Sequence, residues 1–289
     1  MRVAHITDLH VEVVPRAGQL LSKRAIGAVN LYVFGRHAHF TEASVRACVD
    51  AVLAAAPDIV VCTGDLTATA TPEEFVRARE LLAPLLERFP FVTLPGNHDV
   101  YTRGSLGRFR EHFGAWAHDA AFPFVIRNGG VDFVCVDVSR PDWLSRGQAG
   151  ADVLARLDAL LAAGTDPAVV LVHYPLRDRH GEPYGPATRS IVDAAALEAV
   201  IARAGRVAAV LHGHEHHGYR TEIPRAGGGR PIPSFDPGAS GYAWLPDRRR
   251  TAHFNVYDID ADGGIAVERL AFDGSRFVAE VGGAYATGG

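Results

Sequence analysis

The chain has 289 residues, of which 48% are hydrophobic and 21% charged, which is ordinary for a soluble globular protein. Its net charge of -4 at pH 7 gives no reason to expect a nucleic acid polymer as partner, because proteins that bind nucleic acids usually carry a basic face. Three scattered cysteines argue against a disulfide framework, and the strand-like start with no leader pattern ahead of it predicts a cytoplasmic protein.

The first hundred residues alternate between predicted strands and helices. Apolar runs predict strands over 2–7, 59–62 and 91–94, and apolar residues at helical spacing predict helices over 43–56 and 71–88. This β-α-β-α-β order indicates a parallel sheet with right-handed crossovers. Such a sheet brings the carboxyl ends of its strands to one edge.

The second of these helices carries a clear start signal. Thr71 offers a hydroxyl cap, and Pro72 occupies the first helical position. Glu73 and Glu74 place acids in the first turn, where the helix dipole favours them. We therefore expect the helix to begin directly after Thr71.

The remainder of the chain alternates less regularly. We expect strands over 122–126, 131–136, 168–172 and 207–211, helices over 148–163 and 189–204, and antiparallel strands over 252–260 and 264–272. The sequence Asn128-Gly129-Gly130 predicts a hairpin between the first two of these strands. We expect one domain over residues 1–280, followed by a flexible tail at 281–289.

Polar side chains directly follow five of the predicted strands. They are Asp8, His10, Asp65, Asn97, His98, Asp99, His173, His214 and His216. Ligands of open α/β sheets bind at this edge. Carboxylates, one amide and several imidazoles suit Mn, Fe or Zn better than Ca or Mg, which prefer oxygen ligands alone. The set is too large for one tetrahedral ion and about right for two, which together would clamp a phosphoryl group and generate a hydroxide nucleophile.

These residues fall into a series of motifs with a fixed order. The series Asp8-x-His10, Gly64-Asp65, Gly96-Asn97-His98-Asp99, His173 and Gly213-His214-x-His216 resembles the calcineurin-like metallophosphoesterase superfamily. Gly64-Asp65-Leu66-Thr67 and the final His-x-His look closest to its small bacterial class III branch, the cyclic-nucleotide and glycerophosphodiester type. The resemblance implies a four-layer α/β/β/α sandwich of two mixed β-sheets flanked by helices.

The resemblance also implies a role for each residue. Asp8, His10 and His216 would hold the first ion, Asn97, His173 and His214 would hold the second, and Asp65 would bridge the two. His98 would donate a proton to the leaving oxygen, and Asp99 would orient His98. A metal-bridging hydroxide would attack phosphorus in line. The implied activity is hydrolysis of a small phosphodiester.

Two alternatives to this function stay open. Residues 19–40 would insert at the rim of the site, and the basic amphipathic stretch 19–36 fits contact with a lipid surface at the inner membrane face. Such a contact would suit a pyrophosphatase acting on a lipid-linked nucleotide of the UDP-diacylglucosamine type, although a helix packed on the enzyme's own core explains the same pattern. The second alternative is a non-catalytic scaffold, which would not need to keep every ligand together with His98. The sequence does not reveal the oligomeric state.

Four further residues near the motifs receive separate predictions. Many relatives have a second histidine where this chain has Tyr174, which we expect to line the substrate pocket and contact a leaving group. His5 lies inside the first strand and is predicted to be a hydrogen-bonded core residue. His212 and His217 flank the proposed ligands and would either line the pocket or support the scaffold.

Overall fold

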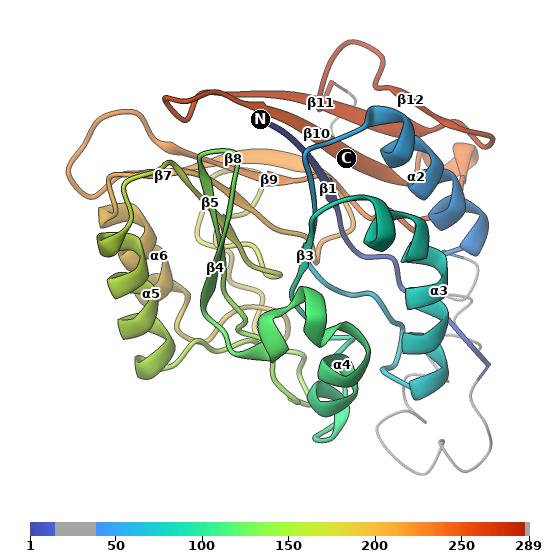
Figure 1. Cartoon of the computed structure of the whole chain (residues 1–289), viewed down its shortest axis with the longest axis horizontal. Coiled ribbons are helices and arrows are strands. Elements are labelled where there is room, and N and C mark those ends of the chain that lie inside the picture. The colour runs from blue at the N-terminus through green and yellow to red at the C-terminus, as the bar shows by residue number, and fades with distance from the viewer. Residues whose placement is uncertain (15–38, 287–289) are drawn as a thin grey trace.

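A computed structural model describes residues 1–14 and 39–286 of the chain. Two six-stranded sheets face each other, and helices cover the outer face of each sheet (Figure 1). This arrangement is the predicted α/β/β/α sandwich. The predicted rim segment 19–40 lies outside the described residues, apart from His39 and Phe40.

The first sheet combines strands from both ends of the chain, in the order β12-β11-β10-β1-β2-β3. Its strands are β1 (Arg2–Ile6), β2 (Ile59–Cys62), β3 (Phe91–Thr93), β10 (His253–Ile259), β11 (Ile265–Phe272) and β12 (Phe277–Ala279). Strands β1, β2 and β3 are parallel, whereas β10 runs antiparallel to both β1 and β11. The predicted parallel start and antiparallel end of the chain are confirmed.

The second sheet has the order β4-β5-β6-β7-β9-β8. Its strands are β4 (Phe124–Asn128), β5 (Val131–Cys135), β6 (Ala168–Leu171), β7 (Val207–Leu211), β8 (Tyr219–Ile223) and β9 (Ile232–Asp236). Strands β4 and β5 form the predicted hairpin, in which Asn128 pairs with Val131. The two residues between them, Gly129 and Gly130, both have positive φ, which a tight hairpin turn requires.

Five α-helices are formed by the described residues. They are α2 (Glu42–Ala55), α3 (Pro72–Arg88), α4 (Ser105–Phe113), α5 (Ala151–Ala163) and α6 (Ala194–Arg203). Helices α2 and α3 pack together on the first sheet, and α5 and α6 pack together on the second (Figure 1). Helix α4 was not predicted, because only Ser105, Phe109 and Phe113 of this helix are buried, which leaves little apolar periodicity to detect.

Side chains of the second sheet alternate between its two faces. Phe133 and Cys135 of β5 and Leu171 of β6 belong to the core between the sheets. Val134 and Val170 instead pack in the separate core beneath α5 and α6. On each of these strands, the residues that face the core between the sheets form an inner row. Residues that continue an inner row beyond the carboxyl end of its strand therefore point into the seam, which is the boundary between the two sheets.

Helix α3 begins where the sequence predicts. The Thr71 hydroxyl accepts a hydrogen bond from the Glu74 N–H (3.2 Å), and the Glu74 carboxylate accepts one from the Thr71 N–H (3.0 Å). This reciprocal pair is a capping box, which satisfies backbone donors that the helix leaves without partners.

We predict that Thr71→Ala lowers the free energy of unfolding by about 1 kcal/mol, because the substitution removes the acceptor for the Glu74 N–H. Urea denaturation measures this change. Thr71→Ser keeps the hydroxyl and serves as the control, with most of the stability retained. Equal losses for both variants would show that the methyl group, and not the cap, accounts for the effect.

Candidate metal centre

The seven predicted metal ligands lie together where the two sheets meet. Asp8 and His10 follow β1, Asp65 follows β2, Asn97 follows β3, His173 follows β6, and His214 and His216 follow β7. The first sheet therefore supplies four of them and the second sheet three. Two groups with closely spaced ligand atoms result, and Asp65 belongs to both.

Most of these residues sit on unusual backbone conformations. Positive φ angles occur at Asp8 (52°), His10 (46°), Asp65 (54°), His214 (79°) and His216 (61°). Non-glycine residues adopt this region rarely, and each such position costs about 1 kcal/mol or more. Hydrogen bonds between the loops hold two of them, because the Asp8 and His10 amides donate to the carbonyls of Gly64 and Asp65 at 3.0 Å. Strain that is held by the surrounding structure is typical of functional sites.

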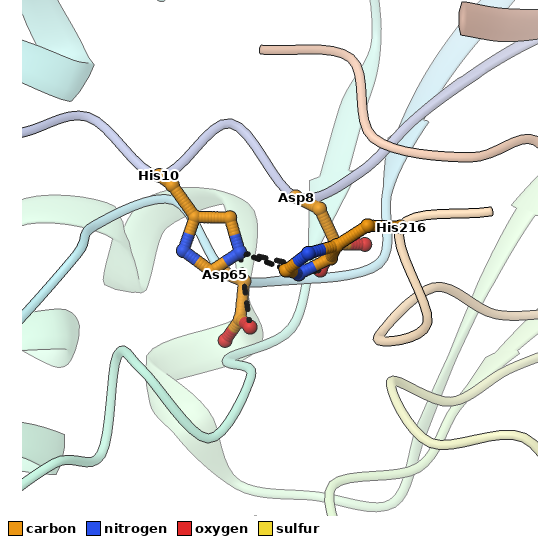
Figure 2. Close-up of side chains that lie close together, drawn as sticks. All are labelled: Asp8, His10, Asp65 and His216. Carbon is orange, nitrogen blue, oxygen red and sulfur yellow. Dashed lines mark hydrogen bonds and ion pairs between the residues drawn. The ribbon is translucent and has the colours of Figure 1, made fainter. Parts of the chain in front are cut away.

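Figure 2 shows the first group, in which Asp8, His10, Asp65 and His216 point toward one another. His10 Nε2 lies 3.6 Å from both Asp8 Oδ1 and Asp65 Oδ2. His216 Nε2 lies 3.3 Å from Asp8 Oδ1 and 2.9 Å from His10 Nε2. Two imidazole nitrogens at this separation need a proton or a cation between them.

The second group consists of Asp65, Asn97, His173 and His214. His173 Nε2 lies 3.3 Å from Asp65 Oδ2 and 3.1 Å from Asn97 Oδ1. His214 Nδ1 lies 2.9 Å from Asn97 Oδ1 and 3.3 Å from His173 Nε2. Asp65 Oδ2 is therefore the atom that the two groups share.

Two buried oxygens test whether cations fit this site. Asp8 Oδ1 and Asp65 Oδ2 accept no hydrogen bond from any described residue. Their partner oxygens are satisfied, because Asp8 Oδ2 accepts from the His214 N–H (2.9 Å) and Asp65 Oδ1 accepts from the His98 N–H (2.8 Å). A buried carboxylate oxygen without a donor is costly unless a cation lies against it. Both orphaned oxygens face the imidazoles, so the residues fit two cations that share Asp65.

Backbone carbonyls fix the orientation of two imidazoles in the second group. His173 Nδ1 lies 2.8 Å from the Thr63 carbonyl, and His214 Nε2 lies 3.1 Å from the Arg189 carbonyl. Each of these nitrogens donates its proton to a carbonyl, which leaves His173 Nε2 and His214 Nδ1 as lone-pair ligands. Sequence motifs cannot reveal Thr63 or Arg189, because every residue type has a backbone carbonyl.

The electrostatics of the centre favour positive charge. Burial would raise the pKa of Asp65, but His173 and His98 hold it well below its usual range. Burial lowers the pKa of His10 to about 3, against the opposing effect of Asp8, so that this imidazole is a neutral ligand. Burial would also lower the pKa of His173, yet the Asp65 carboxylate raises it to about 9. The position beside Asp65 Oδ2 thus attracts a proton or a metal cation.

His98 lies next to the first group. Its Nδ1 is 2.6 Å from the Ala68 carbonyl, and its ring centroid is 4.6 Å from that of His10. Because Nδ1 donates to the carbonyl, a proton transferred by this ring would leave from Nε2. This geometry is compatible with the predicted acid, whose role stays a prediction.

Asp99 does not orient His98 as the motif predicts. Its carboxylate is fully buried and accepts hydrogen bonds from the N–H groups of Gly96 (3.0 Å), Leu66 (3.1 Å) and Thr67 (2.9 Å), and from the Thr67 hydroxyl (2.8 Å). Burial and the nearby charge of Asp65 raise the pKa of Asp99 to about 7. Asp99 therefore ties the loop after β2 to the loop after β3, and it acts on the centre through the backbone.

Tyr174 also differs from its prediction. The side chain is fully buried, its hydroxyl donates to the Ser145 carbonyl (2.9 Å), and its ring centroid lies 4.5 Å from that of His214. Tyr174 therefore supports a proposed ligand and does not line a substrate pocket.

The flanking histidines divide between the core and the surface of a cavity. His5 is fully buried between the hydroxyls of Thr63 (2.9 Å) and Tyr257 (3.3 Å), which confirms its predicted core position. His212 is fully buried 3.6 Å from Asp236, as expected for scaffold support. His217 lines a cavity of about 630 Å³.

Comparison with known proteins supports the interpretation of this site. A model of the calcineurin-like phosphoesterase family matches residues 1–218. A purple acid phosphatase from yellow lupin (Lupinus luteus) seeds has a similar structure, with a TM-score of 0.64 and 15% identity over 96% of this chain and 52% of the lupin protein. A dimetal phosphatase from Danio rerio has a TM-score of 0.63 and 14% identity over 96% of this chain and 98% of its own.

A third similar structure is a 5'-nucleotidase precursor from Thermus thermophilus. Its TM-score is 0.55 and its identity 15%, over 96% of this chain and 54% of the precursor. The chain thus spans about half the length of the lupin and Thermus proteins. No curated protein matches the sequence. At these identities the likeness to solved structures shows the fold alone.

We predict that Asp65→Asn reduces bound metal at both groups, because Asp65 Oδ2 is common to them. Metal analysis should find about two ions per chain in the wild type and fewer than one in the variant. His173→Ala is the matched comparison, since it removes a ligand of the second group only and should leave about one ion. Retention of two ions by Asp65→Asn would contradict the shared-ligand geometry.

The altered assignment of Asp99 leads to a second prediction. Asp99→Asn places amide hydrogens against backbone donors, so we expect a loss of about 2 kcal/mol in unfolding free energy together with weaker metal binding. His98→Asn should change neither quantity much. If both variants instead kept wild-type stability and metal content, Asp99 would not hold the two loops together.

Proposed function

The chain belongs to the calcineurin-like phosphoesterase family, and we propose that it hydrolyses small phosphodiesters with two bound transition-metal ions. The observation that carries this proposal is the buried, orphaned Asp65 Oδ2, which lies between two groups of imidazole and oxygen ligands. Its mixed ligand set favours Mn, Fe or Zn. The ions, when bound, would neutralise phosphoryl charge and lower the pKa of a water molecule.

His98 is the proposed proton donor to the leaving oxygen. The Ala68 carbonyl fixes its Nδ1, and the hydrogen bond from its backbone N–H to Asp65 Oδ1 sets its position relative to the ligands. Protonation of the leaving oxygen avoids the release of an alkoxide, which is the difficult step for esters of ordinary alcohols. The charged form of His98 would present Nε2–H for this transfer.

The choice of a diester is supported by the sequence motifs. Gly64-Asp65-Leu66-Thr67 and Gly213-His214-x-His216 resemble the class III branch, whereas phosphomonoesters are the competing class of substrate. The lipid-linked nucleotide is a weaker candidate, because it depends on residues 19–36, which lie outside the described residues. Within the described residues, no helix has the length and apolar character needed to cross a membrane. A cytoplasmic location stays a prediction from the sequence.

We predict that the wild-type protein hydrolyses bis(4-nitrophenyl) phosphate and a glycerophosphodiester, and that His98→Asn keeps its metal. The variant should lose about 100-fold or more in kcat on the glycerophosphodiester. Its loss on the nitrophenyl ester should be much smaller, because 4-nitrophenolate leaves without a proton. Steady-state kinetics on both substrates measures the difference.

His180→Asn is the control for the His98 experiment, because it removes an exposed histidine outside the metal groups. Its kinetics should match the wild type. Equal losses of His98→Asn on both substrates would exclude His98 as the acid for the leaving group. A wild-type protein that is fully loaded with metal but inactive on every phosphoester would overturn the proposed function and favour a scaffold.

A further inference from the structure

A carboxyl group that the motifs do not include lies beside the second metal group. In the parallel pairing of β5 with β6, Cys135 lies opposite Leu171. The bond that completes this pair runs from the Val136 N–H to the Leu171 carbonyl (2.9 Å). Two residues beyond this pair, Asp137 lies near enough to His173 for the two side chains to interact electrostatically. Both continue the inner rows of their strands, so both point into the seam that holds the metal ligands.

The hydrogen bonding of Asp137 leaves it available to a ligand. Ser139 is the only described residue that donates a hydrogen bond to it, from its N–H to Oδ1 at 2.7 Å. Asp137 is half-buried, and neither of its oxygens is among the enclosed atoms that lack a partner. Its Oδ2 is therefore not completely enclosed by the described residues. Asp99 differs in this respect, because four hydrogen bonds occupy its carboxylate.

The segment around Asp137 is anchored to the loop of the proposed acid. The Ser139 hydroxyl donates to the Pro95 carbonyl (3.0 Å), two residues before Asn97. Asp137 thus lies close both to His173, which follows β6, and to the loop that carries Asn97 and His98, because His173 and Asp99 both interact with it electrostatically. Burial raises the pKa of Asp137 to about 7 against the effect of Ser139, which reflects a setting where water screens a hydrogen bond only weakly.

We propose that Asp137 accepts a hydrogen bond from a hydroxyl on the organic part of the substrate, so that esters of polyols or ribose are preferred. This inference rests on the proposed phosphoesterase function. A phosphoryl group carries negative charge, which a carboxylate repels, whereas a hydroxyl offers the donor that Oδ2 lacks. Hydrogen bonds to charged groups discriminate strongly, because the partner is left unpaired when the substrate lacks the hydroxyl.

The test compares two ligands that share a phosphoryl group and differ in their hydroxyls. Glycerol 3-phosphate and propyl phosphate are titrated into metal-loaded protein by calorimetry. The wild type should bind glycerol 3-phosphate at least about tenfold more tightly. Asp137→Ala should abolish this preference. Asp137→Asn keeps the size and the bond to Ser139, which guards against misfolding, and should reduce the preference.

Asp152→Asn is the control, because it removes an exposed carboxylate in the first turn of α5 and should keep the full preference. Equal affinity of the wild type for the two ligands would overturn the inference. Equal weakening of both ligands in the Asp137 variants would also overturn it, since that pattern indicates a phosphoryl contact or a structural role. Hydrolysis of bis(4-nitrophenyl) phosphate, which has no hydroxyl, by the wild type tests the proposed function separately.

Discussion

The buried carboxylate oxygen Asp65 Oδ2 needs a positive charge beside it, and the rest of the site is arranged around that need. It accepts no hydrogen bond from the described chain, and it faces His10 from the first sheet and His173 from the second. Removing such a charge from water costs several kcal/mol unless positive charge lies against it. Cation binding and the approach of the two sheets are therefore linked, because the same oxygen takes part in both.

The backbone at the proposed ligands adopts energetically unfavourable conformations. Five of the seven proposed ligands have positive φ, although none of them is glycine. Hydrogen bonds from neighbouring loops keep them there, and Asp99 is central to this because it holds the loops after β2 and β3 in contact. The site is thus made rigid by groups that never touch a metal ion, and rigid placement is what positions reacting groups in a catalyst.

Sequence reasoning located the ligands because each follows an apolar strand, and strand ends meet at one edge of a sheet. The predictions were wrong for side chains whose hydrogen-bond partners are backbone atoms. Asp99 and Tyr174 have the residue types of an orienting acid and a pocket aromatic, but the amides of Leu66 and Thr67 and the carbonyl of Ser145 occupy them. Such partners depend on loop conformation, which apolar periodicity does not encode. Helix α4 was not predicted, because too few of its residues are buried to produce a clear apolar period.

The position of β10 has a consequence for how the protein is made. Strand β1, which leads into Asp8 and His10, lies between β2 and β10 and so pairs with residues from both ends of the chain. During synthesis one edge of β1 stays without its partner until the ribosome has released residues 253–259. The pairing around β1 is therefore completed late in translation, and long-range pairing of this kind is intrinsically slow. A nascent chain therefore contains most of the proposed metal-ligating residues well before strand β1 has both of its neighbouring strands.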